Sequence, residues 1–95
     1  MSKADPLTRR CVVVRGQVQG VGFRWYAKEL ADSLALTGWV RNREDGAVEL
    51  EVEGSAVTLD DFVRRLRTGN PSARVDEIAV TLTAPRGGHG FEIRS

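Results

Sequence analysis

Strand-like and helix-like segments alternate along these 95 residues, and their order limits the chain to very few folds. Two segments carry apolar residues at helical spacing. They predict one helix over Phe23–Leu34 and a second between the N-cap Ser55 and the stop at Gly69-Asn70-Pro71. β-Branched or alternating apolar runs predict strands at Arg10–Arg15, Thr37–Asn42, 48–53, 78–82 and 91–93. The expected element order is therefore β-α-β-β-α-β-β.

A right-handed crossover through each helix folds this order most simply into a sheet with both helices on one face. We therefore expect an α+β protein, a ferredoxin-like α/β sandwich (βαββαβ plus a short fifth strand) with a mainly antiparallel sheet. The length suits one hydrophobic core, so we expect a flexible N-terminus at residues 1–8 and a single domain over residues 9–95. Because the first helix is a crossover, the strands on either side of it run in the same direction. Asn42 is then predicted beside the segment Gly16–Arg24, at one edge of the sheet.

The reactive and charged residues count against several kinds of site. With a single histidine and a single cysteine, a zinc site or a Ser-His-Asp triad is not expected. We interpret Cys11 as a small buried hydrophobe and His89 as an exposed turn residue. A net charge of +1 gives no overall attraction to nucleic acid or anionic membranes, and no apolar run reaches the roughly 20 residues that span a bilayer. Because the N-terminus has no signal-peptide pattern, we expect a cytoplasmic protein.

The segment Gly16–Arg24 has the composition of an anion-binding loop. Its glycines permit left-handed backbone, which can point successive N–H groups inward, and it leads into a helix N-terminus that favours phosphate. Arg24 in the first helical turn opposes the helix dipole, and a bound anion would relieve that conflict. On glycine spacing alone, a glycine-rich turn with a surface arginine is the commoner interpretation. The predicted position of Asn42 beside the loop favours a site.

Two longer motifs resemble a known family. Val14–Arg24, with the sequence VRGQVQGVGFR, resembles the loop signature of the acylphosphatases. Gly38–Asn42, followed by Asp45–Glu49 and Gly54, is similar to the second signature of that family, and both motifs stand in the right order and spacing. The similarity covers nearly the whole chain, because it continues through Gly69-Asn70-Pro71, Val75 and Phe91-Glu92-Ile93.

The resemblance implies an enzyme that hydrolyses an acyl phosphate to a carboxylate and inorganic phosphate. Carried over by position, the catalytic residues are Arg24, which binds the phosphoryl group, and Asn42, which positions the attacking water. The resemblance also implies that the phosphate oxygens are surrounded by the backbone N–H groups of Gln17, Val18, Gln19, Gly20, Val21 and Gly22. The expected partner is a small acyl phosphate, with no nucleic acid and no membrane, and the expected state is a monomer.

General chemistry agrees with a reaction that needs no metal and no other cofactor. Phosphoryl transfer passes through a loose transition state, so catalysis rests on positioning and charge stabilisation. A carboxylate is a good leaving group and needs little help from a general acid. Asn42 is neutral and cannot act as a base, but its carbonyl oxygen can accept a hydrogen bond from water. Magnesium is not required if Arg24 and the loop carry the charge.

Several side chains qualify the resemblance. Ala35 stands where the family often has a glycine that ends the helix, and the chain ends in Ser95 where many relatives end in an aromatic residue. Because the fifth strand runs back toward the active edge, the terminal carboxylate of Ser95 is placed to pair with Arg24. We expect Trp25 and Trp39 to pack rather than to line the site entrance.

Three other functions share features with this chain. The RNA-recognition fold has the β-α-β-β-α-β order, but it stacks bases on aromatic residues of its open sheet face. Here the third predicted strand presents Glu49, Glu51 and Glu53 on that face, and three carboxylates repel a phosphate backbone. A non-catalytic anion-binding or regulatory domain is compatible with the same fold. Acylphosphatase-like domains also occur inside larger carbamoyl-transfer proteins, and the end of the chain just after the fifth strand favours a free-standing enzyme.

Overall fold

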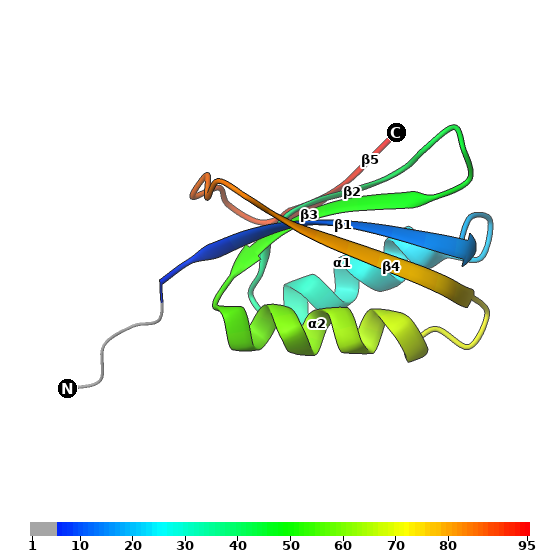
Figure 1. The fold of residues 1–95 in the computed structure, drawn as a ribbon, viewed down its shortest axis with the longest axis horizontal. Coiled ribbons are helices and arrows are strands. Elements are labelled where there is room, and N and C mark those ends of the chain that lie inside the picture. Colours follow the sequence, from blue (N-terminus) through cyan, green and yellow to red (C-terminus); the bar gives the residue numbers. More distant parts are fainter. Residues whose placement is uncertain (1–5) are drawn as a thin grey trace.

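The computed structural model describes residues 6–95, which form one sheet covered by two helices. The elements are β1 (Thr8–Gln17), α1 (Phe23–Ser33), β2 (Thr37–Asn42), β3 (Val48–Gly54), α2 (Ala56–Thr68), β4 (Arg74–Thr83) and β5 (Phe91–Arg94). Across the sheet the strands follow the order β4-β1-β3-β2-β5, and every pair is antiparallel except β2–β5. Both helices lie on the same face of the sheet (Figure 1). The ferredoxin-like sandwich predicted from the element order is confirmed.

The N-terminal boundary of the sheet lies at Thr8, which pairs with Gly54 of β3. Residues 1–5 of the expected flexible N-terminus lie outside the described residues. Among residues 6–95 no helix is long and apolar enough to cross a membrane.

The hydrophobic core lies between the sheet and the two helices. The helices contribute the apolar stripes expected from their spacing, and the sheet contributes the inward-facing members of its three central strands. The fully buried or nearly buried residues include Val12, Val14, Val40, Val48, Leu50, Val52, Phe23, Ala27, Leu30, Ala31, Leu59, Phe62 and Leu66. One continuous core therefore fixes the start of α1 against the ends of β1 and β2.

β1 and β4 are both longer than their apolar patterns predict, because their ends pair with each other. β1 does not stop at Gly16, but continues through a bulge between Arg15 and Gly16 to Gln17, which pairs with Arg74. Gly16 has φ +135°, and a Cβ atom there would lie 2.1 Å from the carbonyl oxygen of Arg74. The glycine is therefore required by the close approach of β4. This pairing holds the start of the β1–α1 loop in place.

The open face of the sheet is less exposed to solvent than expected for the glutamate side chains of β3. Arg9 donates to Glu51 at 2.7 Å and to Glu53 at 3.2 Å, and only 3% of Glu53 is exposed. The backbone N–H groups of Arg86 and Gly87 donate to the same Glu53 carboxylate at 2.7 and 3.0 Å. The Arg86 bond is the largest cause that holds the pKa of Glu53 below its ordinary value. The loop after β4 therefore folds over this end of the open face.

Cys11 also lies on the open face, so its interpretation as a buried hydrophobe is wrong. The side chain is half-buried, and its Sγ lies 3.9 Å from a carboxylate oxygen of Glu49. Burial, followed by the nearby Glu49 charge, raises the pKa of the Cys11 thiol. The cause is geometric, because Cys11 pairs with Glu51 and therefore points away from the helices.

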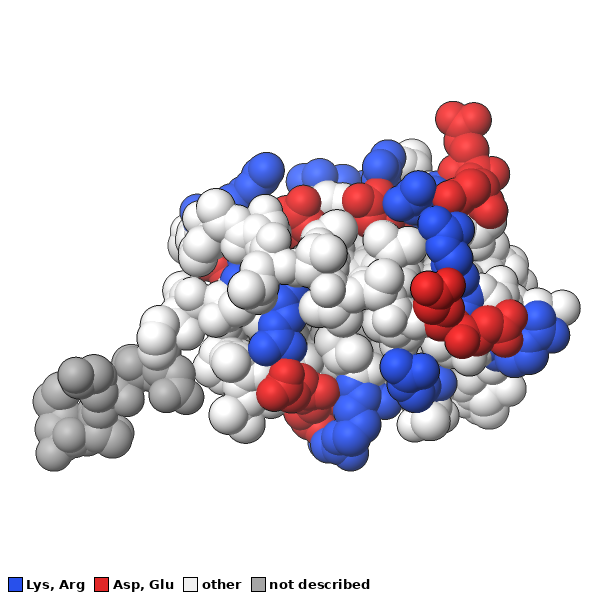
Figure 2. Space-filling model, viewed as in Figure 1, with Lys and Arg blue, Asp and Glu red and all other residues white. Residues whose placement is uncertain are grey.

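Acidic and basic side chains are interleaved over the surface, as Figure 2 shows for one face. Most arginines of the described residues have an acidic partner: Arg10 pairs with Asp60 at 2.7 Å, and Arg41 pairs with Glu49 at the same distance. No single-sign patch dominates the face in view, which agrees with the net charge of +1.

Candidate active site

A small cavity lies where the β1–α1 loop, the start of α1 and the end of β2 meet. Its volume is about 110 Å³, and its lining consists of Val18, Gly20, Gly22, Phe23, Arg24, Trp25 and Asn42. The topology accounts for this meeting, because α1 joins β1 to β2 as a crossover and both strands end at this edge. Arg24 and Asn42, which are separated by 18 positions in the sequence, are thus brought to one cavity as predicted.

The N-terminus of α1 has no side-chain cap. The N-cap residue is Gly22 in the left-handed conformation (φ 75°), and the first turn contains no acidic residue. The first intrahelical bond runs from the N–H of Tyr26 to the carbonyl of Gly22 at 3.0 Å. The N–H groups of Phe23, Arg24 and Trp25 therefore have no acceptor within the helix. Such a helix start is suited to bind an anion.

Gly20 and Gly22 are required by their left-handed backbone conformation, and not because neighbouring atoms exclude a side chain. Gly20 and Gly22 both have φ +75°, and a Cβ atom at either position would meet nothing within 4 Å. L-Residues adopt this backbone at a cost of roughly 1–2 kcal/mol. The loop thus combines left-handed turns with open space on the cavity side, a combination typical of anion-binding backbone.

Arg24 reaches across the cavity edge to β5. Its Nη1 donates to the carbonyl oxygen of Arg94 at 3.0 Å, so the expected pairing with the terminal carboxylate of Ser95 is replaced by a backbone contact one residue earlier. Lys28, one turn further along α1, donates to the carbonyl of Phe91 at 2.9 Å. A guanidinium has five N–H donors, so the Arg94 contact leaves most of them available for an anion.

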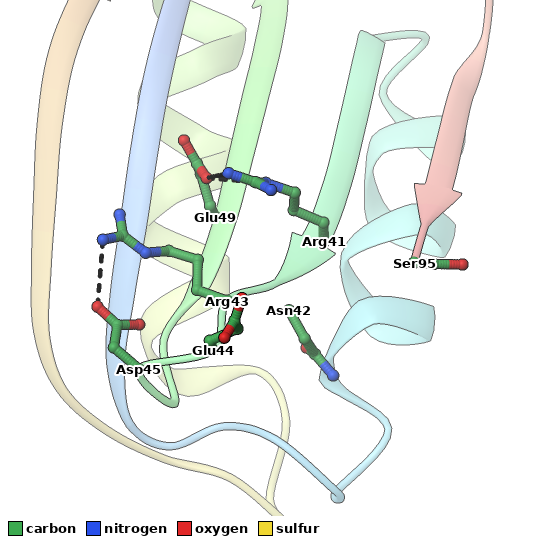
Figure 3. A pocket seen from close by; sticks show the side chains of 7 residues that line it. All are labelled: Arg41, Asn42, Arg43, Glu44, Asp45, Glu49 and Ser95. Atoms are coloured by element: carbon green, nitrogen blue, oxygen red, sulfur yellow. Dashed lines mark hydrogen bonds and ion pairs between the residues drawn. The ribbon is translucent and has the colours of Figure 1, made fainter.

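Asn42 supplies an unusual acceptor to the cavity. Its Oδ1 is buried and has no hydrogen-bond donor among residues 6–95. In Figure 3 its side chain points away from the Arg41–Glu49 pair and toward the loop that leads into α1. An unpaired buried carbonyl costs about 1–3 kcal/mol, so its retention needs an explanation. A water or ligand that donates a hydrogen bond in the cavity supplies one.

Gln19 connects the loop to the β2–β3 hairpin. Its Nε2 donates to the carbonyl oxygen of Arg43 at 2.8 Å and to that of Ala47 at 2.9 Å. Sequence reasoning missed this side-chain contact, because a glutamine in a loop has no local pattern that indicates a distant backbone partner.

The six residues expected to surround a phosphate lie in different environments. Val18, Gly20 and Gly22 line the cavity, whereas Gln17 ends β1 opposite Arg74. Val21 packs against the hydrophobic core, and the Gln19 side chain turns to the hairpin. The cavity is therefore formed by only part of the loop, together with the helix start and Asn42.

Trp25 was expected to pack, and that expectation is wrong. Its residue surface is 64% exposed, and it lines the cavity directly after Arg24. Trp39 lies on the open sheet face, where the Arg94 guanidinium stands 4.9 Å from its ring centroid.

A wider and shallower hollow borders the other side of Asn42. It measures about 630 Å³ and is lined by Arg41, Asn42, Arg43, Glu44, Asp45, Glu49 and Ser95 (Figure 3). Its arginines are already paired: Arg41 with Glu49 at 2.7 Å, and Arg43 with Asp45 at 3.1 Å. The N–H of Ala47 is the largest cause that lowers the pKa of Asp45. Unlike Arg24, these cations are neutralised by carboxylates.

Residues 6–95 contain no group of three His, Cys, Asp or Glu side chains that could hold a metal ion. His89 lies exposed in the loop after β4, as interpreted from its glycine neighbours. The cationic side chain that lines the cavity is Arg24.

A glycine-rich loop, an uncapped helix N-terminus and an arginine around one cavity are features typical of oxyanion-binding sites, here on a ferredoxin-like fold. The family model described as Acylphosphatase matches residues 10–93. The chain therefore belongs to the acylphosphatase family.

Individual relatives agree over nearly the full length. An acylphosphatase from Nostoc sp. is 47% identical over 88 residues, which is 93% of this chain and 87% of the relative. The crystal structure of acylphosphatase from Bacillus subtilis has a TM-score of 0.89 at 41% identity and covers 95% of this chain and 100% of that chain. Full-length HypF has a TM-score of 0.88 at 28% identity, covering 100% of this chain but only 13% of HypF. The activity is that of an acylphosphatase, a hydrolase that acts on the acid anhydride bond of acyl phosphates.

Proposed function

We propose that the cavity beside the N-terminus of α1 binds the phosphoryl group of the acyl phosphate and that hydrolysis needs no metal ion. In this proposal, Arg24 and the backbone N–H groups of residues 17–22 hold the phosphate oxygens, and Asn42 orients the attacking water. The observation that supports it best is the buried Oδ1 of Asn42, which has no donor among residues 6–95 and borders the same cavity as Arg24.

The proposed reaction transfers the phosphoryl group to water. The water oxygen forms a bond to phosphorus while the bond between phosphorus and the acyl oxygen breaks, and the carboxylate leaves with the electron pair. One water proton is held by Oδ1 of Asn42, which aims the oxygen lone pair at phosphorus. The other passes to a phosphate oxygen or to solvent. Arg24 and the free N–H groups of α1 stabilise the charge that the phosphoryl oxygens carry in the transition state.

The charges that the chain itself provides support the proposed metal independence. The guanidinium of Arg24 is permanently charged and binds phosphate oxygens through parallel hydrogen bonds. The helix dipole adds partial positive charge at the same point. The carboxylate leaving group is stable as an anion, so no Lewis acid has to assist its departure.

We also propose that the protein acts on its small substrate as a monomer in the cytoplasm, without nucleic acid or membrane. The interleaved surface charges support the absence of a polyanionic partner. With one cysteine, the chain forms no internal disulfide, which suits a reducing compartment. Sedimentation and cell fractionation test the two parts of this proposal.

The central experiment measures hydrolysis of an aryl-acyl phosphate such as benzoyl phosphate in the presence of EDTA. We expect wild-type turnover to be unchanged by the chelator. Arg24→Ala should lower kcat/KM by about 10³-fold and abolish inhibition by inorganic phosphate. Asn42→Ala should lower kcat while inorganic phosphate still inhibits.

Three results would contradict the proposal. Hydrolysis that stops with EDTA and returns with Mg²⁺ would refute metal independence. Full turnover of Asn42→Ala would remove Asn42 from the mechanism, and a stable wild-type protein that binds phosphate without turnover would favour the anion-binding domain instead.

A further inference from the structure

The side chain of Gln19 forms a bridge between the phosphate loop and the β2–β3 hairpin. Its Nε2 donates at 2.8 Å to the carbonyl oxygen of Arg43 and at 2.9 Å to that of Ala47. These distances are typical of well-formed amide hydrogen bonds. An amide NH₂ group has two protons, so both donors of Gln19 are used by the hairpin.

The two acceptors belong to a hydrogen-bonded turn that immediately follows Asn42. The N–H of Arg43 donates to the carbonyl of Ala47 at 2.8 Å, and the N–H of Gly46 donates to the carbonyl of Arg43 at 3.2 Å. Each of these carbonyls thus accepts one bond from the hairpin and a second from Gln19. Gln19 therefore binds the hairpin at Arg43, the residue after Asn42, and at Ala47, the residue before Val48, which pairs with Asn42.

Gln19 lies between two loop residues that line the cavity, Val18 and Gly20. Its backbone thus lies in the loop proposed to bind phosphate, and its side chain is bonded to the hairpin that follows Asn42. Because both Nε2 protons are bonded to carbonyls, the amide has no N–H left for a substrate oxygen. The two N–H donors of Gln19 can therefore affect hydrolysis only through the position of the groups to which they are bonded.

We propose that Gln19 is a positioning residue that fixes the separation between the bound phosphoryl group and Asn42. This inference rests on the proposed function, since it takes Asn42 as the residue that orients water. The reaction requires water and phosphorus at near-contact distance and in line, and a displacement of about 1 Å can cost about 100-fold in rate. Gln19 sets that distance because its two hydrogen bonds connect the β1–α1 loop to the hairpin that follows Asn42.

The test is a double-mutant cycle on kcat with Gln19→Met and Asn42→Ala, measured with benzoyl phosphate. Methionine keeps the length of the side chain and lacks both donors. We expect Gln19→Met to lower kcat about tenfold to 100-fold, while the inhibition constant for inorganic phosphate changes less than about twofold. In the Asn42→Ala background, the same substitution should have no further effect on kcat.

Tyr26→Phe is the matched control. It also removes a side-chain bond to a distant carbonyl, that of Arg65 at 3.0 Å, but this bond lies outside the cavity. We expect a loss of stability with unchanged kcat, which separates a positioning effect from a general loosening of the fold. Circular dichroism confirms that each variant is folded at the assay temperature.

The outcomes distinguish the inference from the proposed function. If Asn42→Ala lowers kcat and the effects of the two substitutions multiply in the double variant, Gln19 does not act through Asn42 and the inference is wrong. If Gln19→Met weakens phosphate inhibition as much as it lowers turnover, the clamp serves phosphate binding and the inference is also wrong. If Asn42→Ala leaves kcat unchanged, the proposed role of Asn42 fails, and the role of Gln19 fails with it.

Discussion

The two helices of this domain begin in opposite ways. At α2 the Oγ of Ser55 accepts a hydrogen bond from the N–H of Thr58 at 3.3 Å, so a side chain satisfies the helix start. At α1 the N-cap is Gly22, which has no side chain, and the first turn carries Arg24 instead of an acid. The same chain thus builds one helix N-terminus with a side-chain cap and one without.

Under the proposed function, the difference marks the place where helix stability is exchanged for phosphate binding. A capping side chain stabilises a helix by about 1 kcal/mol, and a cation in the first turn opposes the dipole. α1 lacks the cap and carries the opposing cation, yet its first residue, Phe23, is buried in the core. A bound phosphate would reverse both penalties, because it accepts from the free N–H groups and pairs with Arg24.

The loop after β4 also has free backbone N–H donors, but there a carboxylate of the protein itself accepts their hydrogen bonds. The N–H groups of Arg86 and Gly87 bind the carboxylate of Glu53, as the N–H groups of α1 are proposed to bind an external phosphate. Here the acceptor belongs to the protein, so the loop contributes to the fold. At α1 the proposed acceptor is the substrate, so the corresponding gain would appear in binding and catalysis.

Among the changes that test this comparison, the largest effect is expected when α1 is given an acidic residue at its N-cap. Gly22→Asp places a carboxylate at the N-cap, where the left-handed backbone tolerates aspartate and a Cβ atom has free space. We expect kcat/KM to fall about 100-fold, or about 2.7 kcal/mol, because the carboxylate repels the phosphoryl group. The control, Gly22→Asn, has the same shape without the charge and should keep most of the activity. Equal losses in the two variants would show that shape, and not charge, is responsible.

Glu53→Gln tests how much the Glu53 carboxylate contributes to stability by binding the loop after β4. We expect the free energy of unfolding to fall by about 2 kcal/mol at pH 7, because a charged acceptor is lost from two N–H groups and Arg9. The pKa of Glu53 is held below its ordinary value, so its contribution is complete above about pH 4.3 and is lost as the pH falls through the folded-state pKa. Urea unfolding of both proteins between pH 7 and pH 3 should therefore show curves that converge in acid. A constant difference over this range would mean that the carboxylate charge is not what the loop binds.

Ser55→Ala removes the cap that α2 has and α1 lacks. We expect the free energy of unfolding to fall by about 1 kcal/mol, because the Thr58 N–H loses its acceptor. Turnover should stay within about twofold of wild type, since α2 begins away from the cavity residues. Denaturant melts and steady-state assays measure the two quantities on one preparation, and a loss of turnover without a loss of stability is the result that breaks the comparison.

The smallest effect is expected at the other end of α1. Ala35 has φ 56° and is the one non-glycine residue with positive φ among residues 6–95. Glycine relieves a strain of roughly 1–2 kcal/mol but costs about 0.5–1 kcal/mol in chain entropy. We expect Ala35→Gly to stabilise the protein by about 0.5 kcal/mol without changing kcat. A lower melting temperature would mean that the Ala35 methyl contributes more by packing than it costs in strain.

The fold was predictable because its signals are local and periodic. The helical stripes and the alternation at Val48, Leu50 and Val52 correspond to buried faces, and the crossover rule then placed Asn42 beside Arg24. These steps use only spacing and handedness, which the sequence displays directly.

The contacts that were not predicted are long-range and have no period. The Gly16 bulge depends on β4, the Gln19 clamp reaches the carbonyls of Arg43 and Ala47, and Glu53 is covered by a distant loop. In each case a side chain or glycine meets a backbone group that only the folded chain brings near. In β4, by contrast, a periodic pattern is present but does not mark a buried face. Leu82 belongs to the alternating apolar residues of this strand, yet it lies at the sheet edge and is 75% exposed.

The most direct measurement of the difference between the two helices is a titration of the ¹⁵N-labelled protein with inorganic phosphate, followed by amide chemical shifts in EDTA-containing buffer. We expect saturable shifts at the backbone amides of residues 17–25, with the amides at the start of α2 unchanged, and we expect Arg24→Ala to abolish them. Shifts of equal size at both helix starts, or saturable shifts confined to another part of the surface, would contradict the assignment of the phosphate site to the uncapped start of α1.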